Sequence, residues 1–275
     1  MKKKVLSVVA VIVLILAVVL GIKGHRSQQS TTTKKTKVVA ATVAQSNPFT
    51  YKDGDKLTGY DVKLLEAIFN DSKEFELEWQ VVDFTGVLSG IDSNRFQIGA
   101  NNFSSNAERK EKYLLSDPIV KNPNVIVVRK DSDIKSLKDI AGKKAVTEVG
   151  NSGATILEEF NKKNSDDQID ISYTKEDITS QLQSIEKGTY DARIVSKISA
   201  ETLIKNNGFK DLKIVQLTSE ETNNLDVNSY YLIEKTDQGK KIQAFINKRL
   251  KELRKSGDWK SLSEKFFGED NLPAK

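Results

Sequence analysis

Strand-like and helix-like segments alternate along most of this 275-residue chain, and this alternation limits its fold more than any other feature. Residues 37–43 form a mostly apolar run that is typical of a buried strand. Residues 59–69 repeat apolar side chains at a helical spacing, and residues 75–81 alternate apolar and polar side chains as a half-buried strand does. Strands that alternate with helices predict an α/β architecture.

The same pattern continues to the end of the chain. Further strands are predicted at 125–128, 144–146 and 169–173, and further helices near 152–162, 178–187 and 199–206. A final helical region carries its apolar side chains on one face: Ile242, Phe245, Ile246, Leu250 and Leu253, followed by Trp259, Leu262 and Phe266. The roughly 235 residues from Val38 onward are enough for one large domain or for two of moderate size.

An apolar segment precedes this region. Residues 5–22 are apolar apart from Ser7 and Gly21, and basic residues stand on both sides of them. A run of about 18 apolar residues is just long enough to cross a bilayer and is longer than the usual core of a signal peptide, so residues 1–22 are interpreted as a membrane anchor or an export signal. The positive charge ahead of the segment places the rest of the chain outside the cell, either tethered or secreted. Residues 23–36 contain no large apolar side chain, which predicts a flexible tether.

Composition narrows the class of partner. The chain carries a net charge of +5, but eight of its 43 basic residues and none of its 38 acidic residues lie within 1–37. Residues 38–275 are therefore mildly acidic and offer no basic stripe to a phosphate backbone, which argues against a nucleic-acid partner. Cysteine is absent, so the exported part has neither a disulfide nor a lipid-bearing cysteine, and packing alone must hold its fold.

The sequence offers little for catalysis. His25 is the only histidine and lies beside the apolar segment, so neither a Ser-His-Asp triad nor a histidine metal site can form in the folded part. Paired acids such as Glu158 and Glu159 are expected to be solvated. The chain is therefore expected to be no enzyme and to hold no metal and no cofactor.

The segment at 98–118 places small polar side chains five residues ahead of an arginine. Asn101, Asn102 and Ser104 are expected in a polar loop, and Arg109, in the helix that follows, can present a planar fork to both oxygens of a carboxylate. A capped surface helix with a solvated arginine is the simpler alternative. The segment resembles the signature of the solute-binding proteins that serve polar amino-acid ABC importers. In that family the loop and the arginine hold the α-carboxylate and α-amino groups of the amino acid.

Three further segments resemble the same family. Asp61, in the first loop of the folded part, is expected to cap the next helix. Phe84 opens a segment that resembles the one in which an aromatic ring lies over the ligand's side chain, although an ordinary core phenylalanine fits equally well. The Gly-rich turn at 149–153 opens a helix at Ser152, whose N-terminal amides suit an anion. In the family this turn closes over the α-carboxylate from a second lobe, which makes Asn151 and Ser152 candidate binding residues.

The resemblance covers roughly 38–268, and it implies a type II periplasmic-binding fold with two lobes joined by two crossovers. The implied division has a first lobe from 37–120 and 225–275, a second lobe from 121–224, and hinges near 119–124 and 222–228.

The chain departs from the family at two positions. The family usually places the aspartate that holds the ligand's ammonium where this chain has Ser196, so either Asp226, beside the second crossover, supplies the charge or the ligand differs from an ordinary α-amino acid. Ser46 stands where many relatives have an aromatic ring, so either Tyr51 replaces that ring or the pocket is wider. The arginine segment and residues 187–193 resemble the cystine-type members most.

The resemblance therefore implies an extracellular solute-binding protein that captures an amino acid, cystine or another polar one, and delivers it to the permease of an ABC importer. Such a protein is expected to act as a monomer. A surface adhesin or sensory module that keeps the fold without transport is the alternative.

Overall fold

The computed structural model describes residues 34–222 and 225–274, and Thr36–Lys275 forms one compact unit. The predicted membrane anchor or signal at 1–22 and most of the predicted tether at 23–36 lie outside the described residues. In the part of the chain that the structure describes, no helix combines the length and the apolar character that crossing a membrane requires.

The first lobe is built around a mixed sheet with the strand order β5-β1-β6-β14-β7, and β8 pairs with β14. Its strands are β1 (Thr36–Thr42), β5 (Phe75–Val81), β6 (Ile98–Ser104), β7 (Leu114–Leu115), β8 (Val120–Lys121) and β14 (Asn228–Ile233). β1 runs parallel to β5 and β6, whereas β14 runs antiparallel to β6. A small separate sheet contains β2 (Gln45–Ser46), β3 (Thr50–Asp53) and β4 (Lys56–Thr58).

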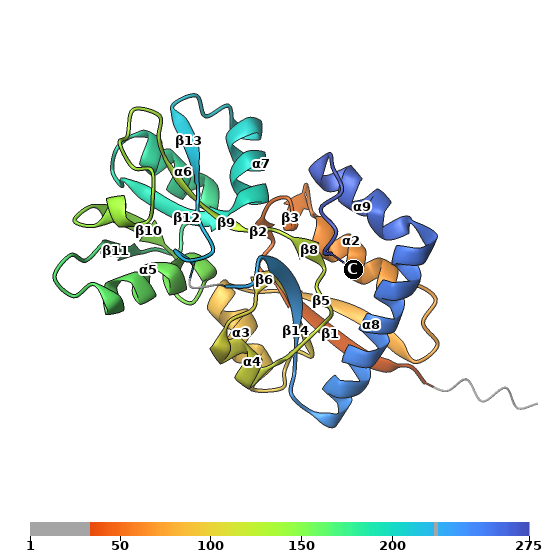
Figure 1. Ribbon diagram of the computed structural model, residues 1–275. Helices are drawn as coiled ribbons and strands as arrows, with labels where there is room; N and C mark the ends of the chain where they lie inside the picture. The colour runs from red at the N-terminus through yellow and green to blue at the C-terminus, as the bar shows by residue number, and fades with distance from the viewer. Residues whose placement is uncertain (1–33, 223–224, 275) are drawn as a thin grey trace, which may run out of the picture. The chain divides into compact units, whose positions relative to one another are not determined.

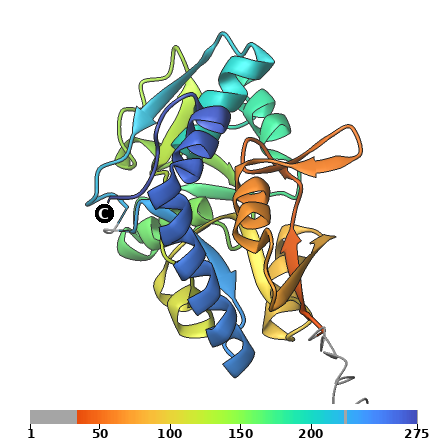
Figure 2. The same cartoon turned by 90° about the vertical axis from the view of Figure 1, so that its right-hand side faces the viewer.

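Helices cover both faces of the first sheet (Figure 1). One face packs against α2 (Tyr60–Phe69), α8 (Asp237–Ser256) and α9 (Asp258–Phe267), and the other against α3 (Phe84–Asp92). Figure 2 shows that α8 and α9, from the end of the chain, lie beside α2. Successive residues of β1 point to opposite faces, so Ala40 packs in the core with α2 and Ala41 packs in the core with α3. Burial on both faces explains why the sequence of this strand is mostly apolar.

The second lobe contains a sheet with the strand order β11-β10-β12-β9-β13. Its strands are β9 (Asn124–Arg129), β10 (Lys144–Thr147), β11 (Asp170–Tyr173), β12 (Ala192–Ser196) and β13 (Leu212–Gln216), and its helices are α5 (Ser152–Lys163), α6 (Ile178–Glu186), α7 (Lys197–Asn207) and a 3₁₀ turn at Lys138–Ile140. β10 is parallel to β11 and β12, and β9 is antiparallel to β12 and β13. One face packs on α5 and the other on α6 and α7.

The chain passes between the lobes twice. β8 ends at Lys121 and β9 begins at Asn124, so the first crossover is short. β13 ends at Gln216 and β14 begins at Asn228, and part of this second crossover lies outside the described residues. The two-lobed α/β fold expected from the sequence is confirmed.

Two local predictions from the sequence are wrong. Asn101, Asn102 and Ser104 lie in strand β6 rather than in a loop, because this segment pairs with β14. Thr50 donates to the side chain of Asn101, and Asn102 donates to Ser196. Asp61 does not cap α2, where Gly59 occupies the N-cap position without a side-chain bond. Oδ2 of Asp61 instead accepts the backbone N–H of Asn102 at 2.6 Å, so this carboxyl links α2 to β6.

Candidate functional site

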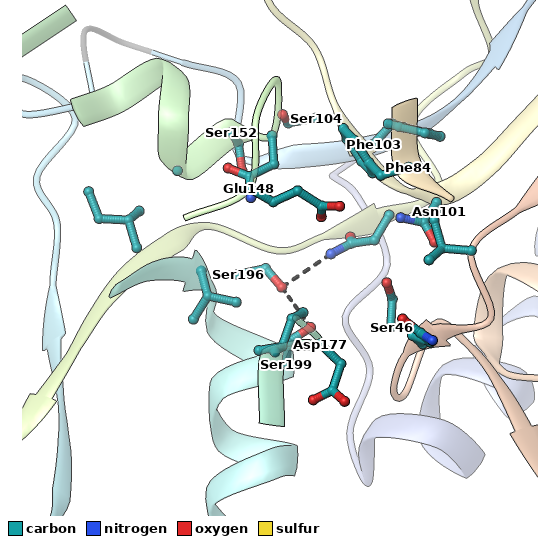
Figure 3. Close-up of a pocket in the computed structure, with 18 of the residues that line it drawn as sticks. Ser46, Phe84, Asn101, Phe103, Ser104, Glu148, Ser152, Asp177, Ser196 and Ser199 are labelled. Atoms are coloured by element: carbon teal, nitrogen blue, oxygen red, sulfur yellow. Dashed lines mark hydrogen bonds between the residues drawn. The ribbon is translucent and has the colours of Figure 1, made fainter. Parts of the chain in front are cut away.

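A cavity of about 100 Å³ lies where the ends of strands from the two lobes meet (Figure 3). Its walls come from α3, β6 and α4 (Ala107–Lys112) in the first lobe, and from the start of α5, the loop before α6 and the end of β12 in the second. Most of the predicted binding residues line it: Phe84, Asn101, Asn102, Ser104, Arg109, Asn151, Ser152 and Ser196. Asp226 is the one predicted residue that is not part of this lining.

Arg109 presents one edge of its guanidinium to the cavity. The residue lies in α4 and is 5% exposed. Its Nη1 donates to the carbonyl oxygen of Ser104 at 2.8 Å and to the hydroxyl at 3.2 Å, and its Nη2 donates to the carbonyl oxygen of Gly150 at 2.9 Å. Because a guanidinium has five N–H donors, Nε and one hydrogen of Nη2 have no acceptor within the described chain. Burial lowers the pKa of Arg109 to about 10, so the group is still charged at neutral pH and suits a carboxylate.

Asn102 connects the two lobes. Its Nδ2 donates to Oγ of Ser196 at 3.1 Å, and its Oδ1 accepts from Ser229 at 2.6 Å and from Asn122 at 3.0 Å. The backbone of Asn102 has a φ of 50°, a left-handed conformation that costs a non-glycine residue about 1 kcal/mol or more. The hydrogen bond to Asp61 and these side-chain contacts hold the residue in that conformation beside the cavity.

Phe84 belongs to the core and to the cavity wall at once. Its ring is 6% exposed and lies 5.5 Å from the ring of Phe103, centroid to centroid, in the cluster that holds α3 on the sheet. Both rings also line the cavity (Figure 3). The guanidinium carbon of Arg109 lies 5.2 Å from the ring centroid of Phe103, so the aromatic pair also packs against the arginine.

The positive end of the α5 dipole lies at the cavity. Asn151 is the N-cap of this helix, and its Oδ1 accepts the N–H of Ala154 at 2.8 Å and the hydroxyl of Thr147 at 3.0 Å. Oγ of Ser152 donates to Oδ1 of Asn124 at 2.9 Å. Because Asn151 and Ser152 both line the cavity, the first turn of α5 faces any anion bound there.

Ser196 and Ser46 bring neutral hydroxyl groups to the cavity wall. Oγ of Ser196 accepts the amide of Asn102 and donates to Oγ of Ser199 at 3.0 Å. Ser46 lines the cavity, whereas Tyr51 does not. The structure therefore does not bring the aromatic ring of Tyr51 to this wall.

The acidic groups of the cavity are ones that the sequence analysis did not select. They are Glu148, Glu176 and Asp177. The carboxylate of Asp226 is used elsewhere: it accepts the backbone N–H of Asn228 at 2.9 Å, the amide of the same residue at 2.8 Å and the hydroxyl of Tyr230. Burial raises the pKa of Glu148, and the charge of Arg193 opposes that rise. Among the described residues, no group of three or more His, Cys, Asp or Glu is placed to hold a metal ion.

Arg193 is a further cavity residue that the sequence analysis did not select. It lies in β12, is 3% exposed, and lines the cavity. Burial lowers the pKa of its guanidinium to about 10. Two features of the sequence could have identified these residues. Arg193 is an arginine inside an otherwise apolar strand. Glu148 is a carboxylate directly after strand β10, and the carboxyl ends of parallel strands form the binding edge of such sheets.

The cavity continues into a wider groove of about 690 Å³. The two share Val43, Gln45, Phe84, Glu148 and Lys175. Beyond them the groove runs along Val81, Val149 and Tyr173, whose side chains are 40%, 55% and 47% exposed. The groove leaves room for a ligand longer than a single amino acid.

Residues 38–269 match the family described as bacterial extracellular solute-binding proteins, family 3. Relatives include the probable amino-acid-binding protein YxeM of Bacillus subtilis, 33% identical over 98% of this chain and 97% of the relative, and the L-cystine-binding protein TcyA of the same organism, 30% identical over 86% and 83%. A structure solved in work on glutathione import through GshT and the cystine ABC importer TcyBC of Streptococcus mutans is 41% identical, covers 88% of this chain and 98% of its own, and superposes with a TM-score of 0.83. This likeness confirms the two-lobed periplasmic-binding fold.

Proposed function

Because the chain belongs to family 3 of the bacterial extracellular solute-binding proteins, we propose that it captures a compound with an α-amino acid group, of the cystine or glutathione kind, and delivers it to an ABC permease. The choice of ligand rests on two similarities. One relative is named an L-cystine-binding protein, and the structure with 41% identity comes from work on glutathione import and a cystine importer. Both compounds are longer than a single amino acid, which fits the groove that continues from the cavity.

The edge of Arg109 that has no acceptor in the described chain is the observation that carries this proposal. Its Nε and the remaining Nη2 hydrogen can donate in parallel to both oxygens of an α-carboxylate, while the first turn of α5 faces the same charge from the other lobe. Groups that are buried and already oriented bind a carboxylate more strongly than exposed ones, because water competes less. The ammonium of the ligand then pairs with the carboxylate of Glu148, which lines the cavity and is partly desolvated by burial.

Delivery requires the permease to distinguish the ligand-bound protein from the ligand-free protein by the arrangement of its lobes. Direct hydrogen bonds already join them on two sides of the cavity, from Asn102 to Ser196 and from Arg109 to Gly150. In the proposed mechanism the lobes separate about the two crossovers, the ligand docks on the first lobe, and closure restores these contacts for the permease to recognise. No chemical change of the ligand is needed.

A ligand screen tests the proposal. The purified full chain, in mild detergent, is heated with each of the twenty amino acids, cystine, oxidised glutathione or reduced glutathione. A closing ligand at about 100 times its Kd should stabilise the fold by about 2.7 kcal/mol and raise the melting temperature by several degrees. We expect cystine or a glutathione form to give the largest rise. If every compound leaves the melting temperature unchanged, the capture role is wrong and the surface adhesin or sensory module becomes the better candidate.

A further inference from the structure

Arg193 is a buried charge that has no hydrogen-bond partner in the described part of the chain. Its Nε and Nη1 are inaccessible to water and have no acceptor among the described residues. Buried polar groups in folded proteins are almost always hydrogen-bonded, and a buried guanidinium without acceptors is costly. A side chain kept in such a state, on the wall of a ligand cavity, points to an acceptor that arrives with the ligand.

None of the described residues supplies that acceptor. Glu148 is the carboxylate whose charge acts on Arg193, but the two side chains form no ion pair within 4.0 Å. Gln181, in the first turn of α6, has a buried Oε1 that also lacks a partner, so it does not accept from Arg193 either. The loop before α6 adds Lys175, Glu176 and Asp177 to the cavity wall, and no hydrogen bond joins any of them to Arg193 in the described chain.

We propose that Arg193 binds a second carboxylate of the ligand, distinct from the α-carboxylate that Arg109 holds. The inference rests on the proposed function and narrows its ligand to compounds with two separated carboxylates. Arg109 belongs to the first lobe and Arg193 to the second. Both residues line one cavity, and both carry N–H groups that no described residue accepts. An amino acid with one carboxylate satisfies only one of the two guanidiniums.

The chemistry of the candidate ligands agrees with two arginines. Cystine carries an α-carboxylate at each end, and glutathione carries one on its γ-glutamyl residue and one on its glycine. A ligand that bridges Arg109 and Arg193 also ties the two lobes together, so the second carboxylate should contribute to closure as well as to affinity. The wider groove provides the length that such a bridge requires.

Calorimetry on acid and ester pairs tests this inference. The full chain is titrated with reduced glutathione and with its glycine monoethyl ester, and with cystine and its monomethyl ester. A hydrogen-bonded charge pair in a buried site is worth about tenfold in affinity or more, so the unaltered chain should bind at least one diacid about tenfold more tightly than the matching ester. In Arg193→Gln that preference should disappear, because the diacid weakens while the ester does not.

Matched variants separate this role from a structural one. Arg129→Gln removes an arginine of the same lobe that pairs with Asp131 outside the cavity, and it should keep the preference for the diacid. Arg193→Lys, which keeps the charge, should retain part of the preference, and the melting temperature of each ligand-free variant reports on its fold. A preference that survives in Arg193→Gln, or an equal loss for acid and ester, overturns the proposal. If neither pair binds while another amino acid does in the screen, this inference fails and the capture role stands; if nothing binds, both fail.

Discussion

At the residue scale, some charged groups in and near the cavity have hydrogen-bond partners within the protein for all of their polar atoms, and others do not. Arg109 makes three hydrogen bonds, to Ser104 and Gly150, that fix the position of its guanidinium. Its remaining N–H groups are therefore oriented and available to a ligand. Asp226 is fully engaged with Asn228 and Tyr230. The contrast supports the proposal that Arg109 binds the ligand and argues against a role for Asp226.

Replacing Arg109 with alanine should abolish binding while the chain still folds. Loss of a charge-assisted pair in a desolvated cavity costs about 3 kcal/mol or more, over a hundredfold in affinity. Calorimetry with the best ligand of the screen measures this loss. Arg95→Ala is the control, because Arg95 packs over the ring of Phe96 and does not line the cavity. A loss of less than tenfold for Arg109→Ala would mean that another group holds the α-carboxylate.

Glu148→Gln should weaken ligands that carry an α-ammonium. The glutamine keeps the size of the side chain but removes the charge that compensates a buried ammonium, so affinity should fall about tenfold or more. A desamino analogue, such as glutaryl-cysteinylglycine for glutathione, should bind both chains alike. Asp226→Asn is the matched control and should bind normally, because Asp226 does not line the cavity. The assignment fails if Asp226→Asn weakens the ligand and Glu148→Gln does not.

At the scale of elements, one carboxyl fixes the position of β6. Asp61, in the first turn of α2, is fully buried and accepts the N–H of Asn102, the strained residue beside the cavity. Burial raises the pKa of Asp61 to about 7, and the hydrogen bond from Asn102 opposes that rise. The folded chain therefore holds a proton on this carboxyl at pH values where the unfolded chain has released it.

The stability of the chain should depend on pH through Asp61. Because its pKa is raised on folding, the folded state binds the proton more tightly, so the free energy of unfolding falls as pH rises from about 4 to about 7, by about 4 kcal/mol at most. Asp61→Asn keeps an oxygen that accepts from Asn102 and cannot titrate, so its decline should be smaller. Urea unfolding at pH 4.5 and 7.5 measures the difference. Asp166→Asn, at an exposed position, is the control, and parallel curves for Asp61→Asn and the unaltered chain would exclude Asp61 as the source.

At the scale of the whole molecule, the two lobes meet through polar contacts rather than through a shared apolar core. Among the described residues, the apolar clusters each lie within one lobe, apart from Ile198 of α7, which joins the cluster that α2, α8 and α9 form with the first sheet. Hydrogen bonds and the exposed pair of Lys175 with Asp83, 3.7 Å apart, connect the lobes at the cavity. Contacts of this kind are weak enough to open and close with a ligand.

The apolar segment at 5–22 decides how the whole protein is attached to the cell. The length of the apolar run at 5–22 and the absence of cysteine favour an uncleaved membrane anchor. Intact mass measurement of the protein from the native cell surface should therefore find a chain that still contains residues 5–22. A mature chain that begins between about 22 and 30 would show that the segment is a cleaved signal.

The sequence by itself determined the α/β class, most of the helices and strands, and the cavity groups of the arginine segment and the Gly-rich turn. The elements follow from local patterns, because apolar spacing predicts them, and the two cavity segments were identified by their resemblance to a known family. Only the tertiary structure decided which acid and which second arginine reach the cavity. Asp226, Glu148 and Arg193 are charged residues in or beside strands, and nothing in their local sequence says which face the cavity. That depends on how two sheets, far apart in the chain, bring the ends of β6 and β12 together, which is set by long-range packing rather than by local pattern.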